Sequence, residues 1–404
     1  MDRREFSRAI GLGIVGAQIF TDFAGAKDLG ATHKKVPASS RKAWSLEHFK
    51  GLENVLVPSY TADFRQVDEA GIRRDVRLAI EQGFFATACG QYTVGLTKNE
   101  QKRFVEIACS EAGDKIQVGT MIVEPLDSAI ELAAHAEKSG CSHMLLISPP
   151  NLYKGSEDEL YSYYARVAET TSLAVVLEYY DDQLSRKWHP AGMSLKVYDR
   201  LADIPNIVAM KLTQTTNPAT AFELSELLGS RILLGPVNLD LVPLLTKHCR
   251  LQWAGMFAAD CVQAPDKRYA VEFMRLMNSG KYEEAMKAYW QFQPANQAFY
   301  DLQAPALALG GHPWTHIKYY EWLIGGNGGL VRDVSRGENA GLLKKVDETS
   351  MPILDSQSRQ RIKNVFRGMG VTIEDRPEEE FLVGREAYAA GVRAADLKYR
   401  FGYA

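Results

Sequence analysis

From Asn54 onward, the chain alternates short apolar runs with segments whose apolar residues recur at helical spacing. Eight such pairs can be counted, and this alternation is typical of a parallel sheet whose strands are joined by crossover helices. The expected strands cover residues 55–57, 84–89, 117–123, 143–148, 174–179, 208–213, 231–235 and 253–257. The expected helices cover residues 68–81, 98–112, 125–139, 157–171, 193–202, 219–228, 239–249 and 266–277.

Eight strand–helix units in about 220 residues match the count and size of a TIM (β/α)8 barrel, whose chemistry lies at the carboxyl ends of its strands. The alternative is an open, doubly wound sheet. No Gly-x-Gly-x-x-Gly turn follows the first strand, however, and no Gly-rich phosphate loop with Lys-Ser/Thr is present. We therefore expect an α/β fold with a (β/α)8 barrel over residues 45–265 and a C-terminal helical bundle over residues 266–373. Residues 374–404 are expected to be an extension that packs on the body or on a neighbouring subunit.

The amino terminus has the three regions of an export signal. Arg3 and Arg4 precede the apolar stretch 9–20, and Ala24-Gly25-Ala26 forms a small-x-small cleavage site. This order is typical of a twin-arginine signal over residues 1–26, followed by a linker over residues 27–44, and it predicts a periplasmic protein. The alternative is an amphipathic helix. The apolar stretch is shorter than the ~20 residues that span a bilayer, so no permanent membrane span is expected.

Composition narrows the classes of partner. The 404 residues are 46% hydrophobic and 24% charged, which suits a large soluble core, and the net charge is only −3. Basic residues are scattered, so no nucleic-acid partner is expected. The five cysteines form no C-x-x-C pair, and His312 and His316 lack a third ligand, so no metal is expected. His189, in a long loop after the fifth strand, is positioned to reach the barrel mouth.

Lys211 is the candidate nucleophile. It ends a mostly apolar run in the sixth strand, and apolar surroundings disfavour the charged form of a lysine, which frees its amine to attack a carbonyl. In isolation, such a segment is more often a strand-end lysine that extends into solvent. Its neighbours Met210 and Leu212 face the opposite side of the strand, so Lys211 points into the predicted barrel.

Several short motifs occur in a characteristic order. They are Val57-Pro-Ser-Tyr-Thr-Ala-Asp63, Leu96-Thr-Lys-Asn-Glu100, Pro149-Pro150 with Tyr153-Lys154, Ile204-Pro-Asn-Ile-Val-Ala-Met-Lys211, and Gly329-Leu-Val-Arg332. In this order the chain resembles the dihydrodipicolinate synthase/N-acetylneuraminate lyase family of class I aldolases and lyases, from about residue 45 to about residue 371. The resemblance implies a Schiff base between Lys211 and a 2-oxo acid such as pyruvate, no cofactor, and a homo-oligomer that is a dimer or a tetramer.

The groups that bind substrate in this family are altered in this chain. After the second strand the family has a carboxylate-binding turn with two hydroxyl side chains, where this chain has Cys89, Gly90, Gln91 and Tyr92. Backbone N–H groups of such a turn still suit an anion, and side chains of Gln91 or Tyr92 are an alternative clamp. Three further candidate binding residues follow other strands, namely Tyr60, Tyr153 and Gly235.

The proton shuttle is also different. The resemblance places a Tyr-Asn-x-Pro motif at the end of the fifth strand, where this chain reads Leu-Glu178-Tyr179-Tyr-Asp. An ungapped match makes Glu178 the shuttle, whereas a one-residue bulge brings Tyr179 to that position. The family's second relay tyrosine, in Pro-Pro-Tyr-Tyr, is also missing. We therefore do not expect a true lysine-pathway dihydrodipicolinate synthase.

The predicted function is a Schiff-base lyase or aldolase that makes or breaks a C–C bond in a 2-oxo acid. Two alternatives remain open. One is a periplasmic binding or scaffold protein that keeps the barrel without turnover. The other is a hydratase or decarboxylase that uses the same lysine.

Overall fold

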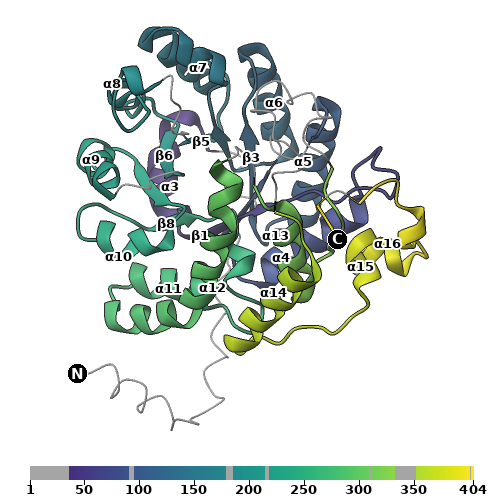
Figure 1. The fold of residues 1–404 in the computed structure, drawn as a ribbon. Helices are drawn as coiled ribbons and strands as arrows, with labels where there is room; N and C mark the ends of the chain where they lie inside the picture. Colours follow the sequence, from purple (N-terminus) through teal and green to yellow (C-terminus); the bar gives the residue numbers. More distant parts are fainter. Residues whose placement is uncertain are drawn as a thin grey trace.

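The computed structural model describes residues 36–90, 95–178, 185–213, 218–308, 312–332, 352–400 and 402–404. Its eight parallel strands form one sheet in the order β7-β6-β5-β4-β3-β2-β1-β8, which curls into a nearly closed barrel (Figure 1). The strands are β1 Gly51–Leu56, β2 Ala86–Cys89, β3 Gln117–Ile122, β4 His143–Leu146, β5 Ala174–Glu178, β6 Ile207–Leu212, β7 Leu233–Pro236 and β8 Trp253–Gly255. The predicted TIM barrel is confirmed.

Helices surround the barrel on its outer face (Figure 1). They are α4 Glu69–Glu81, α5 Lys98–Ala112, α6 Leu126–Ser139, α7 Glu157–Glu169, α8 Leu195–Leu201, α9 Pro218–Leu228, α10 Val242–Leu245 and α11 Tyr269–Asn278. Two of them begin at capping boxes, in which Thr97 pairs with Glu100 and Ser156 pairs with Glu159. The predicted helix over 239–249 is shorter than expected, because its start is the 3-10 turn Leu239–Leu241, capped by Asn238.

Strand β1 begins earlier than its sequence predicted. Glu53 and Asn54 are polar and precede the strand that the sequence predicted, yet both are buried. Inside the barrel, a Glu53 Oε1 atom lies 2.6 Å from Nε2 of His143 on β4. On the outer face of the sheet, Asn54 donates to Asp260 at 3.0 Å. Buried polar groups need such partners, and these partners are distant in the sequence.

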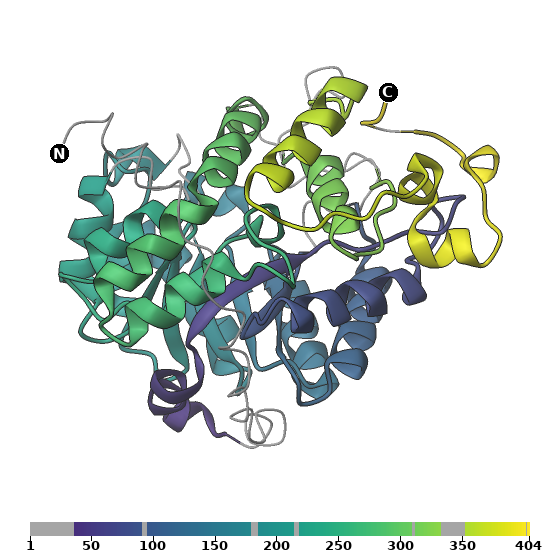
Figure 2. The ribbon, with the colours of Figure 1, turned by 90° about the horizontal axis from the view of Figure 1, so that it is seen from below.

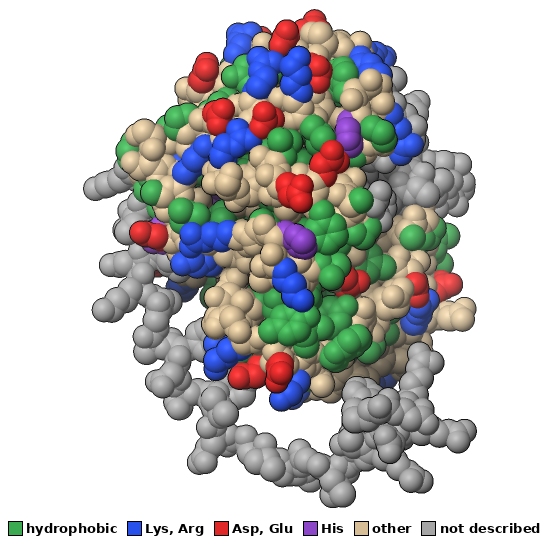
Figure 3. Space-filling model, turned by 90° about the vertical axis from the view of Figure 1, so that its left-hand side faces the viewer, with side chains coloured by type: hydrophobic (Ala, Val, Ile, Leu, Met, Phe, Trp, Pro, Cys, Tyr) green, Lys and Arg blue, Asp and Glu red, His purple; other side chains and the backbone are tan. Residues whose placement is uncertain are grey.

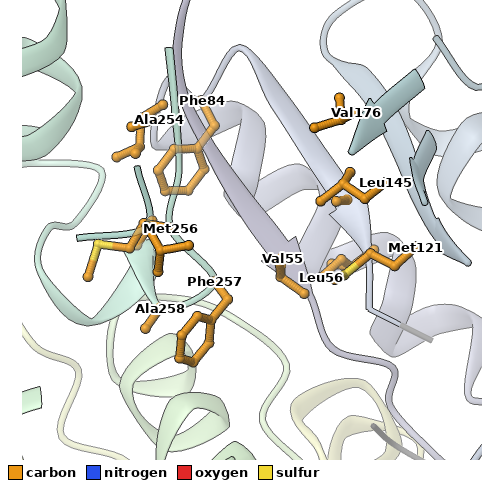
Figure 4. Close-up of a cluster of buried hydrophobic side chains, with 14 of the residues drawn as sticks. Val55, Leu56, Phe84, Met121, Leu145, Val176, Ala254, Met256, Phe257 and Ala258 are labelled. Carbon is orange, nitrogen blue, oxygen red and sulfur yellow. The ribbon is translucent and has the colours of Figure 1, made fainter. Parts of the chain in front are cut away.

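The barrel interior is apolar at mid-height. Met121, Leu145 and Val176 share one row of the strand register, and Figure 4 shows their side chains gathered near Val55. This layer closes the barrel below the carboxyl ends of the strands. On the outside, acidic and basic side chains are intermingled over the face shown in Figure 3, in keeping with the scattered charges of the sequence.

The carboxyl-terminal region is helical, as predicted. It contains α12 Tyr282–Ala308, α13 Trp314–Leu323, α14 Ser356–Gly368, α15 Glu378–Val383 and α16 Arg385–Ala389, and Figure 2 shows these helices along one side of the barrel. The extension packs on the body, where Phe381 is fully buried and Glu386 forms an ion pair with Arg74 of α4 at 2.9 Å. No helix within the described ranges is long and apolar enough to cross a membrane.

At the opposite end of the barrel, helix α3 (Arg41–His48) begins inside the stretch expected to be a linker. Trp44 is buried, and the Gln252 amide nitrogen donates to the backbone carbonyls of Ser45 and Phe49. Through these hydrogen bonds, α3 and the residue that follows it pack against the segment that precedes β8.

A buried charge cluster joins α13 to the barrel. Lys318 is fully buried, and its Nζ lies 2.6 Å from Asp75 of α4 and 3.5 Å from Glu321. Nearby, burial raises the pKa of Asp260 to about 6, although Asn54 and Gln82 donate hydrogen bonds to its carboxylate. Burial also raises the pKa of Glu321 well above its usual range.

Candidate active site

Lys211 and Glu178 lie opposite each other on neighbouring strands, β6 and β5. The β5–β6 register shifts between Val175 and Val176, which pair with Ile207 and Ala209. This irregularity leaves Val208 without a partner on β5, as in a β-bulge. With an unbroken register, Glu178 would lie opposite Met210. The bulge therefore brings the two charged side chains to the same level and the same inner face of the barrel.

The two side chains form a buried ion pair. Lys211 is 2% exposed and Glu178 is fully buried, with 3.2 Å between Nζ and Oε1. The Thr213 hydroxyl donates to the same Oε1 at 2.6 Å, while Oε2 is buried and has no partner among the residues that the structure describes. An amine and a carboxylate in contact, away from bulk water, can act as a nucleophile with an adjacent proton carrier.

A tryptophan lies beside the lysine inside the barrel. Trp253 is fully buried, and its indole occupies the space left by two glycines. A Cβ on Gly235 would lie 2.3 Å from Cε2 of Trp253, and one on Gly255 would lie 2.9 Å from Cζ3 and 3.4 Å from both Cδ and Cε of Lys211. Gly235, which is the register partner of Lys211, thus makes room for this indole.

An aromatic group stands above the pair, at the carboxyl end of β8. Phe257 contacts Phe299 of α12, His312 and Trp314, with ring centroids 5.7, 5.1 and 5.8 Å away. Burial, together with the charge of Lys211, lowers the pKa of His312 to about 4, so its imidazole is neutral at pH 7. Its Nδ1 is buried and has no partner within the described part of the chain.

Sequence reasoning weighed His312 only as a metal ligand and missed its place beside the lysine. The only signal in the sequence was that His312 lies two residues before Trp314. The segment that carries both residues lies outside the strand–helix units of the barrel, so the alternation of these units does not place it. Among the described residues, no group of three or more His, Cys, Asp or Glu side chains is arranged to hold a metal ion.

The predicted carboxylate-binding turn is only partly described. The Cys89 side chain shares its register row with Leu56 and Thr120 and faces the helix layer, where Cys109 of α5 lies nearby. The Gly90 N–H already donates to the Leu56 carbonyl at 3.0 Å. Gln91 and Tyr92 lie outside the described residues, as does Tyr179, so their roles stay predictions.

The other predicted residues lie in different surroundings. The Tyr60 ring is covered by the Arg332 guanidinium at 4.4 Å, and Arg332 binds Glu100 through two hydrogen bonds of 2.7 and 2.8 Å. Tyr153 is buried in the 3-10 turn Pro150–Lys154 that follows β4. The binding roles predicted for both tyrosines stay predictions.

His189 is placed away from the role suggested for it. Its Nε2 lies 3.5 Å from Glu223 of α9, in the outer helix layer. Its Nδ1 accepts the Ala191 N–H at 3.1 Å. Both ring nitrogens are thus engaged with groups on the outside of the barrel.

Comparison with known proteins identifies relatives of the barrel. The sequence model of the Dihydrodipicolinate synthetase family matches residues 48–234. A probable 5-dehydro-4-deoxyglucarate dehydratase of Bacillus licheniformis is 28% identical over 150 residues, which are 36% of this chain and 46% of that protein. A 4-hydroxy-tetrahydrodipicolinate synthase of Chlorobium phaeobacteroides is 34% identical over 181 residues, covering 42% and 56%. The chain thus spans about half the length of these relatives.

Solved structures share the fold at low sequence identity. Dihydrodipicolinate synthase from Aquifex aeolicus aligns with a TM-score of 0.61 and 16% identity, over 81% of this chain and all of that one. N-acetylneuraminate lyase from Fusobacterium nucleatum, solved with pyruvate, aligns with a TM-score of 0.56 and 18% identity, over 79% and 97%. At such identities the likeness establishes the architecture alone.

Proposed function

Because the sequence model of the Dihydrodipicolinate synthetase family matches residues 48–234, we propose that the chain is a member of this family and that the protein is a lyase of 2-oxo acids that works through a Schiff base on Lys211. The single observation that carries this proposal is the buried contact of 3.2 Å between the Lys211 amine and the Glu178 carboxylate at the barrel mouth. A strand-end lysine that only extends into solvent would not place its amine in a buried contact with a carboxylate.

The chemistry follows from these two groups. Glu178 takes a proton from the Lys211 ammonium, and the free amine attacks the C2 carbonyl of the 2-oxo acid. The proton then returns to the carbinolamine oxygen, which leaves as water, so that an iminium ion joins Lys211 to the substrate. This ion accepts the electron pair of a bond to C3. The bond is either a C–H bond, whose proton passes to a base, or the C3–C4 bond, which breaks while the C4 hydroxyl gives its proton to a base and becomes the carbonyl of an aldehyde. Thr213 and Lys211 together hold the Glu178 Oε1 atom in position for these transfers.

Trapping the imine tests the proposal. Incubation with pyruvate and sodium borohydride should add one reduced pyruvate unit to Lys211, found by peptide mapping. The buried Lys318, also paired with a carboxylate, should be unlabelled in the same digest. Lys211→Ala should lose the adduct, whereas Lys187→Ala, an exposed control, should keep it. Failure to trap pyruvate or any other 2-oxo acid would refute the enzyme and favour a binding or scaffold protein that keeps the barrel.

A dehydratase is the second candidate, favoured by the likeness to the probable 5-dehydro-4-deoxyglucarate dehydratase. The same iminium ion acidifies the C3 proton, and elimination then expels a hydroxyl from C4 as water with the carbon chain intact. Product analysis distinguishes the two reactions. Release of an aldehyde together with a smaller 2-oxo acid supports C–C cleavage, whereas a product with an unbroken carbon chain supports dehydration.

Location and assembly complete the proposal. The paired arginines, apolar stretch and small-x-small site of residues 1–26 support export to the periplasm, although these residues lie outside the described part of the chain. Arg3→Lys together with Arg4→Lys should retain the protein in the cytoplasm, as measured by cell fractionation.

A dimer or tetramer is proposed from the family resemblance. Light scattering of the purified protein measures its mass, and the mass of a monomer would contradict this proposal.

A further inference from the structure

The end of the carboxyl-terminal extension lies over the loop that follows β1. We call residues 397–400 the strap. The Lys398 N–H donates to the Ala62 carbonyl of this loop at 3.1 Å, and the Tyr399 ring stacks on Phe64 with 4.0 Å between centroids and 15° between planes. Figure 2 shows this part of the extension, in yellow, beside the loop after β1, in purple. In a TIM barrel the loops that follow the strands form the active-site face, so the strap lies on that face.

The strap is held in place on both sides by contacts with the carboxyl-terminal helical region. Before the strap, the Ala394 N–H donates to the Glu379 carboxylate of α15 at 2.9 Å. After it, the Gly402 carbonyl accepts a hydrogen bond from the Leu354 N–H at 2.9 Å, and the Ala404 N–H donates to the Leu354 carbonyl at 3.3 Å. Because its position is fixed by these contacts, the strap can hold the β1 loop in turn.

Phe64, on which the strap packs, has an unfavourable backbone conformation. Among the described residues, it is the one residue other than glycine with a positive φ, of 57°. A bulky side chain rarely adopts this conformation, and it persists only where the surrounding structure enforces it. Here the Phe64 ring is buried against Tyr399, and the Phe64 N–H donates to the Thr61 carbonyl at 2.7 Å. Loss of the Tyr399 ring therefore allows the loop to relax to another conformation.

From Phe64, a series of contacts continues to the segment before α5. The Phe64 ring lies 6.5 Å from the Tyr60 ring, which the Arg332 guanidinium covers at 4.4 Å. The same guanidinium donates to the Gly95 carbonyl at 3.0 Å and to both carboxylate oxygens of Glu100, the residue that closes the capping box of α5. Two rings and one guanidinium thus join the strap to the loops that follow β1 and β2.

We propose that the strap positions the β1 and β2 loops at the barrel mouth and thereby sets the affinity of the site for its 2-oxo acid. Tyr399 is a positioning residue, because it acts on the mouth through Phe64 and Tyr60. The reacting pair, Lys211 and Glu178, lies on β6 and β5, away from these loops in the strand order. Loss of the strap therefore weakens binding and leaves the formation of the imine at saturation intact. The inference rests on the proposed function.

Removing one ring from the full-length protein tests the proposal. The readout is the pyruvate concentration that gives half-maximal borohydride-trapped adduct on Lys211. Tyr399→Ala should raise this concentration about two- to tenfold, the worth of one aromatic pair, with the maximal adduct unchanged. Tyr399→Phe keeps the stacked ring and should retain the wild-type value. Tyr388→Ala is the matched control, since this half-buried tyrosine of α16 packs against Arg393 instead of the β1 loop, and it should also retain that value.

A second readout does not depend on Lys211. Hydrogen–deuterium exchange, followed by mass spectrometry of peptides, reports how firmly each loop is held. In Tyr399→Ala, residues 61–66 and 95–100 should exchange faster than in the wild type. In Tyr388→Ala, both segments should exchange at the wild-type rate.

The outcomes separate the two proposals. A wild-type protein that forms no adduct with any 2-oxo acid refutes the proposed function, and unchanged exchange in Tyr399→Ala overturns the strap whether or not adducts form. If adducts form, the strap is also overturned by an unchanged half-maximal concentration in Tyr399→Ala, or by an equal rise in Tyr388→Ala. A lower maximal adduct at an unchanged half-maximal concentration indicates lost folding alone and overturns it too. Phe64→Leu removes the stack from the loop side and should repeat the rise, so it decides the matter if Tyr399→Ala does not fold.

Discussion

Gly235→Ala tests the packing beside Lys211 with a single methyl group. The added Cβ would lie 2.3 Å from Cε2 of the Trp253 indole, about 1 Å inside ordinary contact, and that rigid ring is fully buried. Gly235 has no positive φ, so the cost is steric alone. Overpacking of this kind costs about 1–3 kcal/mol. At about 2–4 °C per kcal/mol for a large domain, the Tm should fall by about 2–12 °C.

A double-mutant cycle isolates the contact. Trp253→Leu alone should destabilise the protein by leaving a cavity, but Gly235→Ala should cost less in that background, because the methyl group then occupies vacated space. Urea unfolding of the four proteins measures the difference. Gly368→Ala is the matched control, since nothing lies within 4 Å of a Cβ there, and it should not destabilise. An unchanged unfolding midpoint in Gly235→Ala, or an equal loss in both backgrounds, would refute the reasoning.

Three further outcomes are expected. Thr213→Val removes the 2.6 Å hydrogen bond to Glu178, so turnover should fall about tenfold while pyruvate trapping persists; an unchanged rate would argue against Glu178 as shuttle. Burial raises the pKa of Asp260 from 3.8 to about 6, so the native state binds more protons than the unfolded state between these pH values. Its contribution to stability is therefore lost as pH rises through that window, and the stability of wild type minus that of Asp260→Asn should drop by up to about 3 kcal/mol in urea unfolding; a flat difference would contradict this. Finally, the Cys109 and Cys141 Sγ atoms are 3.6 Å apart, so glutathione disulfide should link them by thiol–disulfide exchange. Mass spectrometry should find the linked peptide, and recovery of both thiols after denaturation would exclude the bond.

Much of the fold was predictable because it depends on local patterns. The capping boxes at Thr97 and Ser156 mark helix starts that need only three neighbouring residues. The start of β1 was missed because Glu53 and Asn54 are buried only through His143 and Asp260, which lie 90 and 206 residues further along the chain. Polar residues with such distant partners look like loop residues in a sequence.

Part of the candidate site was also predictable, because it depends on the local pattern of strand residues. The inward position of Lys211 was predicted from strand alternation, and the structure shows Lys211 buried beside Glu178 at the end of the preceding strand, while the catalytic roles of both residues stay predictions. Whether these two side chains meet depends on the register shift beside Val208. A register shift is a property of two paired strands, so the sequence of neither strand indicates it. The contribution of His312 depends on a segment packing across the barrel mouth, and the alternation of strands and helices says nothing about such packing.

The Glu178–Lys211 pair also has a consequence for protein engineering. Its geometry comes from two adjacent strands, about 4.8 Å apart in any parallel sheet, rather than from a long loop that must be shaped for the purpose. Two register-matched substitutions, with a one-residue bulge to align them, are therefore a compact unit that can be transplanted. A barrel without this chemistry could receive it and then be tested for its ability to capture a ketone.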